Sequence, residues 1–459
     1  MTSIDKFGLE EKRNGGDADV KFGRELRKEF LFDEGWLNVN HGSFGTYPLP
    51  VRNKLRSLQE RAESRPDNFI RYEYPHLLDS SRAALATFLN TDASTLVFVP
   101  NATTGVNVVL RNLVFQPGEK ILYFDNIYGA CEKTIEYITE TTPAESVKVQ
   151  YELPVEDDWL VNAFVETVKR EEAAGFKVKI AIFDTIVSMP GVRLPFEKLT
   201  AACHALSVLS LIDGAHGIGH IPLDLTALNP DFFVSNCHKW LLTPRGSAVF
   251  HVPLRNQHLL RSTLPTSHGF IPVPKPGRKI ATPLPVVGVK SPWVTAFEFV
   301  GTIDSAPYLC VPTALAYRER LGGESRIQSY CHALARAAAH RTASLFGTAV
   351  LDNSTQSHTN CCLSNVRLPL DPAAITAFAA TQNIEAEEVG LEVRNWISKT
   401  LVEEYATFMA VLWYKGDWWV RWSAQVYLEL GDFEEAAGRL AVVCGRVGKG
   451  EWVGVKSKI

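Results

Sequence analysis

The sequence is organised around residues 206–240, LSVLSLIDGAHGIGHIPLDLTALNPDFFVSNCHKW. Two apolar runs in it, Leu206 to Ile212 and Phe232 to Val234, are typical of strands that are buried on both faces. Asp213 follows the first run directly, and Lys239 comes shortly after the second. Because the intervening chain has room for a single crossing, the carboxylate and the lysine are expected at neighbouring strand ends, where open α/β sheets bind ligands.

A carboxylate and a lysine at one edge of a sheet indicate a particular chemistry. Pyridoxal phosphate needs a lysine for its Schiff base and an acidic partner for its ring nitrogen. As an alternative, Asp213 caps a helix and Lys239 is an ordinary surface lysine, and these two residues alone leave that open. The polar residues His216, Asn236 and His238 around them favour the cofactor site.

Two motifs in this stretch resemble a known family. Asp213-Gly214-Ala215-His216 and Asn236-Cys237-His238-Lys239-Trp240 are similar to motifs of the class V, fold-type I pyridoxal-phosphate enzymes. That class includes cysteine desulfurases and isopenicillin N epimerase-like proteins, and the resemblance extends from Asn40 to Tyr427. It implies an α/β fold, with a mostly parallel sheet in a large cofactor-binding domain and a smaller α+β domain at the C-terminus.

The resemblance also implies roles for residues around the cofactor ring. Lys239 matches the Schiff-base lysine and Asp213 the partner of the ring nitrogen, while His216 would lie near the ring hydroxyl and the lysine. Tyr128 matches the residue that stacks on the ring, and it is our candidate general acid. Ser188 is the nearest match to an asparagine that the family often places near the cofactor hydroxyl, so this sequence departs from the family there.

The cofactor phosphate has a candidate site at the start of a helix. Residues 100–105, PNATTG, follow a short apolar strand, and small hydroxyl residues at a helix N-terminus offer free amides and the positive end of the dipole. An ordinary N-cap is the alternative interpretation. The resemblance implies that Thr302 reaches the phosphate from a neighbouring subunit, and hence a homodimer with shared sites. The full phosphate set it implies is Thr103, Thr104, Asn236, His238 and Thr302.

The substrate is expected to be a small molecule that contains an amino acid group. Arg421 matches the arginine that binds its α-carboxylate through a bidentate pair, and the family places a segment like Asn40-His41-Gly42 near the substrate. Aromatic residues near Arg421 could hold a quaternary ammonium group by cation–π attraction, or they could be the core of the small domain. They are Trp413, Tyr414, Trp418, Trp419 and Trp422.

Composition excludes several other classes of function. The net charge of −4 gives no electrostatic case for binding nucleic acid or an anionic membrane. No apolar stretch approaches the ~20 residues of a membrane span. The eight cysteines are scattered without the spacing of a metal site, so we expect no metal and a reduced, cytoplasmic compartment.

The order of predicted elements gives the domain organisation. Helices and apolar strands alternate from Leu96 to Val249, which predicts a doubly covered, mostly parallel sheet. Residues 1–30 are expected to form a flexible leader and the greater part of a first helix. The leader, residues 1–19 or so, is predicted to be disordered, and the helix is predicted over Gly23 to Phe32. The large domain is predicted for residues 31–305 and the small domain for residues 306–459. The Pro- and Gly-rich segment 265–292 is a long loop with a predicted role at the active site or in partner contact.

The absence of a cysteine at one position narrows the range of possible reactions. Desulfurases of the family place a nucleophilic cysteine shortly before the carboxylate-binding arginine, whereas residues 401–419 contain none. This disfavours persulfide transfer and leaves epimerase, aminotransferase or β-lyase chemistry, or a non-catalytic protein of the same fold. The overall resemblance is to the fungal C–S lyases of ergothioneine synthesis, which act on hercynylcysteine sulfoxide. It implies β-elimination to a sulfenate or thiol product, pyruvate and ammonia.

Overall fold

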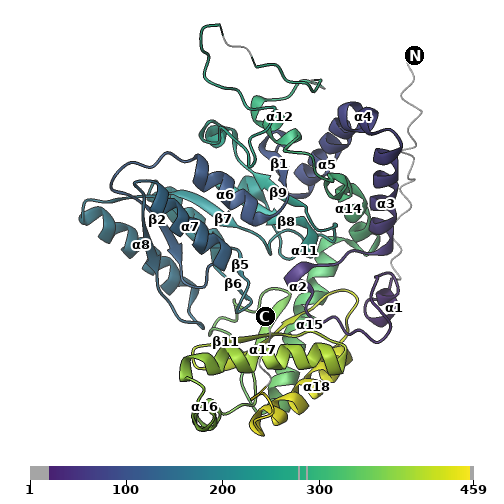
Figure 1. The fold of residues 1–459 in the computed structure, drawn as a ribbon, viewed down its shortest axis with the longest axis vertical. Helices are drawn as coiled ribbons and strands as arrows, with labels where there is room; N and C mark the ends of the chain where they lie inside the picture. Colours follow the sequence, from purple (N-terminus) through teal and green to yellow (C-terminus); the bar gives the residue numbers. More distant parts are fainter. Residues whose placement is uncertain (1–19, 278–279, 286–287, 455–459) are drawn as a thin grey trace.

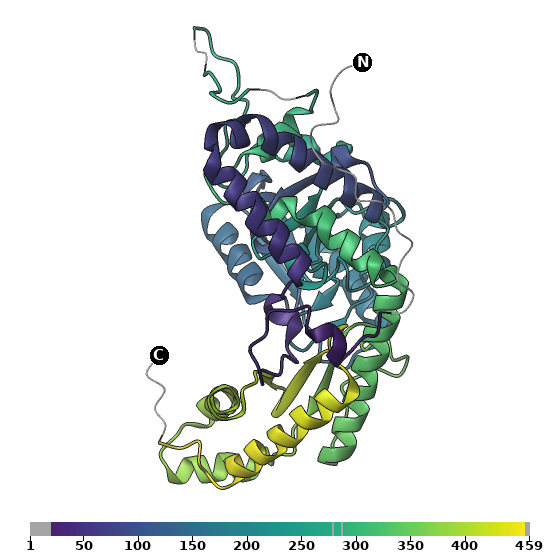
Figure 2. The ribbon, with the colours of Figure 1, turned by 90° about the vertical axis from the view of Figure 1, so that its right-hand side faces the viewer.

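The computed structural model describes residues 20–277, 280–285 and 288–454. It forms a large α/β unit and a smaller C-terminal unit below it (Figure 1). The predicted disordered leader, residues 1–19, lies outside the described residues. Between the two units runs a 24-residue helix, α15 (Gly323–Phe346), which is seen along its length in the second view (Figure 2).

The large unit is built on a seven-stranded sheet in the order β1-β9-β8-β7-β4-β2-β3. The five strands from β8 to β3 are parallel, and β9 pairs antiparallel with both β1 and β8. This confirms the predicted mostly parallel sheet. The strands are β1 (Leu96–Val99), β2 (Glu119–Phe124), β3 (Glu145–Val149), β4 (Lys177–Asp184), β7 (Leu209–Asp213), β8 (Phe232–Asn236) and β9 (Ala248–His251).

Helices cover both faces of this sheet. In β7, Leu211 belongs to one buried apolar cluster and Ile212 to the other, because successive side chains of a strand point to opposite faces. One face packs against α5 (Tyr74–Phe88), α8 (Asp157–Ala173) and α9 (Phe196–Ala205). The other packs against α6 (Ala102–Asn112), α7 (Gly129–Thr141) and α12 (Pro292–Glu298).

The strand predicted from Leu206 is shorter in the structure. Leu206 and Ser207 complete the end of α9, since the Leu206 N–H donates to Ala202 O, and Ser207 has a φ of 55°. The chain reverses there, and β7 begins only at Leu209. Its end at Asp213 is as predicted.

The small unit contains a three-stranded antiparallel sheet in the order β10-β12-β11, with helices packed on it. The elements are β10 (Leu363–Arg367), β11 (Ala410–Tyr414), β12 (Asp417–Ser423), α16 (Pro372–Thr381), α17 (Ala386–Tyr405) and α18 (Leu430–Gly448). Before them, α13 (Ala306–Leu309) and α14 (Val311–Arg320) pack beside the large sheet, on α3 (Leu49–Ser64) and α5.

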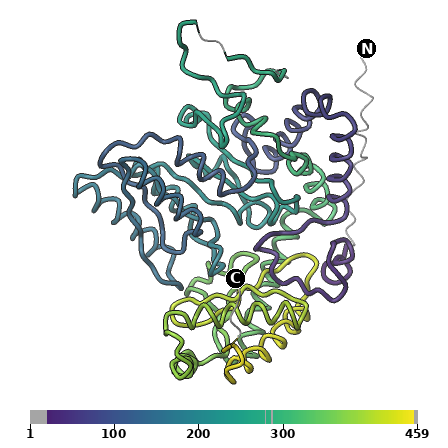
Figure 3. The backbone as a smooth tube through the Cα atoms, in the orientation of Figure 1, coloured from purple at the N-terminus to yellow at the C-terminus, as the bar shows by residue number. Residues whose placement is uncertain are grey.

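The N-terminal segment joins the two units. The predicted helix over Gly23 to Phe32 is only α1 (Arg24–Arg27), which lies against the small unit: Arg27 forms an ion pair of 2.7 Å with Asp432. The chain then passes between the units, where α2 (His41–Phe44) lies, as the backbone trace shows (Figure 3). Short remaining elements are α4 (Pro66–Asn68), α10 (Leu225–Leu228), α11 (Cys237–Trp240), the hairpin β5 (Ile186–Val187) and β6 (Val192–Arg193), and η1 (Phe69–Glu73), η2 (Ala93–Thr95) and η3 (Leu254–Leu259).

Candidate active site

The site lies at the C-terminal ends of β7 and β8. These strands are parallel neighbours, with Asp213 in register with Val234. Asp213 is the last residue of β7, and β8 leads directly into the one-turn helix α11, which carries Lys239. The predicted arrangement, with the carboxylate and the lysine at adjoining strand ends, is the one observed.

Lys239 is a half-buried residue whose amine has one close polar partner among the described residues. Its Nζ lies 2.9 Å from Nε2 of His216. Burial, together with the positive charge of Arg421, lowers the pKa of Lys239 to about 8, although Asp213 and Asp184 oppose the shift. Desolvation disfavours the charged form of a lysine, so roughly a tenth of this amine is uncharged at neutral pH, far more than of an ordinary lysine.

Asp213 is held by two donors. Its Oδ1 accepts from the Ala215 N–H at 2.9 Å, and its Oδ2 from the Cys131 thiol at 3.4 Å. Burial raises the pKa of Asp213, while these donors and the positive Lys239 oppose the rise. Cys131 lies in the first turn of α7, so this helix is positioned by the carboxylate of β7.

Sequence reasoning missed a second carboxylate, Asp184. It ends β4 in register with Asp213 and is buried. Burial and the charge of Asp213 raise the pKa of Asp184 well above its usual range. Since Asp213 has the N–H and S–H donors, it carries the charge and Asp184 the proton. The available signal was positional, because Asp184 terminates an apolar strand as Asp213 does.

The N-terminus of α6 is tied to the end of β8. Asn236 Oδ1 accepts from the Ala102 N–H at 2.9 Å, and Asn101 Oδ1 accepts from both the N–H and the hydroxyl of Thr104. The Thr104 hydroxyl is therefore part of an ordinary N-cap, which was the alternative to a phosphate site at this helix start. In the described structure the Thr103 hydroxyl makes no hydrogen bond, so it is left for a phosphate oxygen.

His238 is a neutral imidazole in this arrangement. Its Nδ1 lies 3.0 Å from Ser247 O, so this nitrogen is the donor. Burial lowers the pKa of His238 to about 4. Nε2 then holds a lone pair, and His238 can donate to a phosphate oxygen only when the anion brings a proton or raises this pKa.

Arg421 connects three segments from distant parts of the chain. Its Nη1 donates to Ser188 O at 2.6 Å, and its Nη2 donates to Asn40 Oδ1 at 2.8 Å and to Ser43 Oγ at 2.9 Å. The side chain is buried, yet Nε has no partner within the described residues. A buried guanidinium with an unsatisfied N–H fits a carboxylate ligand.

The geometry argues against direct substrate contact by His41 and Gly42. Both ring nitrogens of His41 are occupied: Nε2 lies 2.6 Å from Lys239 O and Nδ1 3.1 Å from Tyr427 Oη. A Cβ on Gly42 would lie 3.1 Å from Trp240. The reason is that α2 packs on α11. His41 and Gly42 therefore contact the helix that carries Lys239 on the side away from the substrate. Of the predicted substrate segment, Asn40 contacts Arg421.

The aromatic residues near Arg421 divide between the two faces of β12. Trp418 and Trp422 are fully buried, and their indole N–H groups donate to Gly390 O and Thr342 Oγ1. Arg421 alternates with them and points to the other face. Trp413 is paired with Trp418 and lies with it on the helix side. These three rings belong to the core side, whereas Tyr414 and Trp419 share the face of Arg421.

Tyr128 and Thr302 make no side-chain hydrogen bond within the described residues. Tyr128 is the N-cap residue of α7 and is half exposed. Cys131, one turn further on, reaches Asp213, so Tyr128 begins at the same edge of the sheet. Thr302 is exposed in the segment before α13. The roles predicted for both residues remain predictions.

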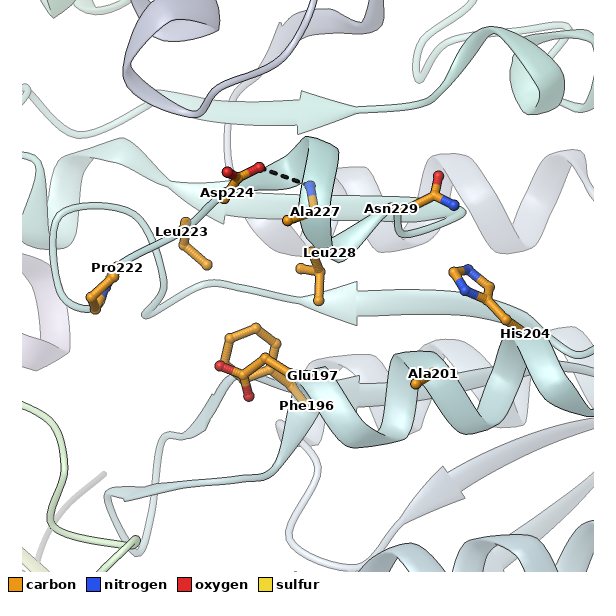
Figure 4. Close-up of a pocket in the computed structure, with 10 residues that line it drawn as sticks. All are labelled: Phe196, Glu197, Ala201, His204, Pro222, Leu223, Asp224, Ala227, Leu228 and Asn229. Atoms are coloured by element: carbon orange, nitrogen blue, oxygen red, sulfur yellow. Dashed lines mark hydrogen bonds between the residues drawn. The ribbon is translucent and has the colours of Figure 1, made fainter.

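A separate cavity lies away from this site. It measures about 540 Å³ and lies between α9 and α10, lined by residues such as Phe196, Leu223 and Leu228 (Figure 4). Its carboxylates are committed, because Asp224 caps α10 and Glu197 pairs with Arg193. Among the described residues no group of three His, Cys, Asp or Glu side chains could hold a metal ion, and no helix has the length and apolar character needed to cross a bilayer.

These groups fit pyridoxal phosphate. A half-buried, partly neutral lysine and an ionised carboxylate lie at adjoining strand ends. Beside them are a helix N-terminus with a free hydroxyl and a buried arginine with an unsatisfied N–H. The fold and the site together define a fold-type I pyridoxal-phosphate enzyme. Residues 70–404 match the Aminotransferase class-V family, and the chain belongs to it. The predicted family and cofactor are therefore confirmed.

Similar proteins fall in the same class. The chain is 36% identical to the "L-cysteine desulfhydrase-like protein lolT1" of Epichloe uncinata, over 93% of this chain and 97% of the relative. It is 28% identical to the "Hercynylcysteine sulfoxide lyase" of Schizosaccharomyces pombe, over 90% and 95%. The fold matches the solved structure of a cystine C–S lyase bound to cysteine persulfide, with a TM-score of 0.67 at 18% identity, over 89% and 98% of the two chains.

Proposed function

We propose that the protein is a carbon–sulfur lyase that cleaves a cysteine S-oxide conjugate, hercynylcysteine sulfoxide, by β-elimination in ergothioneine biosynthesis. The products would be a sulfenate, pyruvate and ammonia. One observation carries the choice of elimination over sulfur transfer: all eight cysteines are buried. Burial also raises the pKa of the thiols nearest the site, Cys131 and Cys237, so neither is a ready thiolate nucleophile.

The proposed roles follow from the positions of the side chains. Lys239 would hold the cofactor, Asp213 would face its ring nitrogen, and Thr103, Asn236 and His238 would surround its phosphate. Bound pyridoxal phosphate withdraws electrons from the substrate Cα, which makes the Cα proton acidic.

Four side chains would then act on the substrate. Arg421 would hold its carboxylate, with Asn40 fixing the guanidinium. Lys239, released as a neutral amine, would take the Cα proton. Tyr128 is the candidate acid for the leaving oxygen. A sulfenate is a weaker base than a thiolate, so the C–S bond of an S-oxide breaks with less help from an acid.

A second candidate is elimination from free cysteine. The 36% identical relative is named as an L-cysteine desulfhydrase-like protein, which favours a small leaving group. The two candidates share the roles of Lys239, Asp213 and Arg421. They differ at the sulfur, which in free cysteine carries neither the substituent nor the oxygen that Tyr128 would protonate. A panel of cysteine, S-alkyl cysteines and their S-oxides, followed by pyruvate release, distinguishes them.

The panel has a clear expected result. We expect the conjugate S-oxide to give the highest kcat/KM, and Lys239→Ala to give no pyruvate. Replacing Cys131, Cys237, Cys361 and Cys362 with alanine or serine should spare pyruvate release in a folded, cofactor-loaded protein. Loss of turnover in such a protein would indicate a cysteine nucleophile, and equal rates on all substrates would reject the S-oxide specificity.

We also infer that the active unit is a homodimer with shared sites. Support comes from the exposure of Thr302 and from the long loop that precedes α12 and extends from the body of the molecule (Figure 1). Mixing Lys239→Ala with Thr302→Ala chains should restore some activity, because both lesions can fall in one pocket and leave the other intact. A fully active monomer in sedimentation would contradict this.

A further inference from the structure

Trp240, the residue after Lys239, is the most firmly held side chain around the lysine. It is buried, and its ring lies 3.9 Å from that of His220 and 5.1 Å from that of His41, between centroids. The carbonyl of Trp240 accepts from Arg318 Nη1 at 2.7 Å. The indole is therefore packed against two imidazole rings, and the hydrogen bond from the Arg318 guanidinium fixes its backbone.

The indole N–H donates to the imidazole that contacts Lys239. Trp240 Nε1 lies 3.1 Å from His216 Nδ1. An indole nitrogen can only donate, so Nδ1 must be the acceptor, and the neutral ring then carries its proton on Nε2. Nε2 is the atom that lies 2.9 Å from Lys239 Nζ.

This fixes the direction of the second hydrogen bond. An Nε2–H group must donate to Nζ, and only an uncharged amine has a lone pair to accept it. The opposite arrangement, an ammonium donating to Nε2, would need the proton on Nδ1, where it would face the indole N–H. Two donors would then point at each other in a buried site.

We propose that Trp240 is a positioning residue: its indole N–H selects the Nε2–H tautomer of His216, and that tautomer favours the uncharged form of the Lys239 amine, the form that reacts with an aldehyde. The inference rests on the proposed role of Lys239. It assigns Trp240 an effect on how readily the cofactor attaches, separate from packing.

The surrounding charges agree with this. Burial keeps the pKa of His216 well below its usual range, and the positive charge of Arg421 acts in the same direction, so the ring stays neutral. His220 and His238 act in the same direction. On Lys239 itself, Arg421 favours the neutral amine, while Asp213 and Asp184 favour the charged one.

The first test reads the tautomer directly. Full-length protein freed of cofactor and labelled with ¹⁵N-histidine should show His216 with its proton on Nε2. In Trp240→Phe, which keeps a stacking ring and removes the N–H, a signal from Nδ1–H should appear. Trp422→Phe is the matched control, because that buried indole donates to Thr342 Oγ1 and not to His216. A wild-type His216 protonated on Nδ1 would overturn the proposal without any variant.

The second test measures cofactor attachment. The rate at which borohydride traps pyridoxal phosphate on the cofactor-free chain should rise with pH to a midpoint near 8 in the wild type. In Trp240→Phe the midpoint should move towards the ordinary lysine range, with attachment roughly tenfold slower near neutral pH. In a His216→Gln background, where no imidazole tautomer exists, Trp240→Phe should have no further effect. An unchanged midpoint, or a shift that persists in that background, would reject the proposal. Trapping on a lysine other than Lys239 would instead reject the proposed function.

Discussion

Arg421 shows how much a single side chain depends on its fixed surroundings. Its guanidinium is held by Ser188 O, Asn40 Oδ1 and Ser43 Oγ, which come from two segments distant in sequence. A lysine at this position would keep the charge but lose the planar set of donors. Of these two residues, only arginine therefore has the donor geometry needed to bind a carboxylate at this position.

The corresponding prediction is that Arg421→Lys raises KM for the amino acid substrate and lowers kcat/KM by tenfold or more, since a lost bidentate bond corresponds to ~1.4 kcal/mol or greater. Steady-state kinetics of pyruvate release measure this. Arg367→Lys is the control, because that arginine lies on the same sheet and pairs with Asp417 at 3.7 Å. If the two variants had equal kinetics, Arg421 would not be a substrate-binding residue.

Gly191 offers a second test at the same scale. Its backbone is clamped by Asn365, and a Cβ there would lie 2.7 Å from Arg421 Cδ and 2.9 Å from a Leu363 methyl. Gly191→Ala should displace the stem of Arg421 and raise KM several-fold, while the visible absorbance of bound cofactor stays the same. Gly129→Ala is the control, because nothing lies within 4 Å of the added atom. An unaltered KM would mean that the guanidinium tolerates the shift.

At the scale of elements, the start of α18 fixes the N-terminal segment. Asp432 is buried, accepts from the Glu429 N–H at 2.9 Å in a capping box, and pairs with Arg27 of α1 at 2.7 Å. One carboxylate thus caps a helix and positions the chain that leads to Asn40. Removing it leaves a helix N–H and a buried guanidinium without their acceptor.

We therefore predict that Asp432→Ala lowers the free energy of unfolding by about 2 kcal/mol. Urea denaturation followed by circular dichroism measures it. Glu434→Ala, in the same helix turn, is the control: its pair with Arg341 lies at the surface and contributes little. The assignment fails if both variants have the same midpoint.

At the scale of the whole molecule, buried histidines make stability depend on pH. Burial lowers the pKa of His41, His238 and His251 to about 4 each, from an ordinary value of 6.5. Between these values the unfolded chain binds more protons than the folded one, so stability falls as pH falls. The raised pKa values of Asp184 and Asp213 act in the opposite direction but concern only these two groups at the site.

The expected result is a free energy of unfolding that decreases steadily as the pH is lowered from the ordinary histidine value towards 4. Urea titrations of the cofactor-free protein across this window test it. His251→Phe removes one of these titrating groups and should therefore make the dependence shallower. His251 is chosen because it lies at the far end of β9 from the site. A stability that is constant over the window would contradict the prediction.

The sequence by itself determined the sheet and the position of its reactive edge. Apolar runs that end in Asp213 and lead to Lys239 fix neighbouring parallel strands, since such strands must be buried on both faces. The same local logic could have found Asp184. It failed at Leu206, where the end of α9 takes residues that look like strand, and at Gly23 to Phe32, where docking on α18 decides the backbone.

Contacts between distant segments were decided only by the tertiary structure. Two examples are the contact of His41 with the backbone of Lys239 and the burial of Trp418 and Trp422 on the face of β12 opposite Arg421. Both depend on which face each residue presents to a remote neighbour. The tautomer of His216 is set in the same way, by an indole N–H that folding brings to its Nδ1. Local patterns specify which residues lie at the edge of a sheet, but hydrogen bonds between segments hundreds of residues apart exist only once the chain is packed.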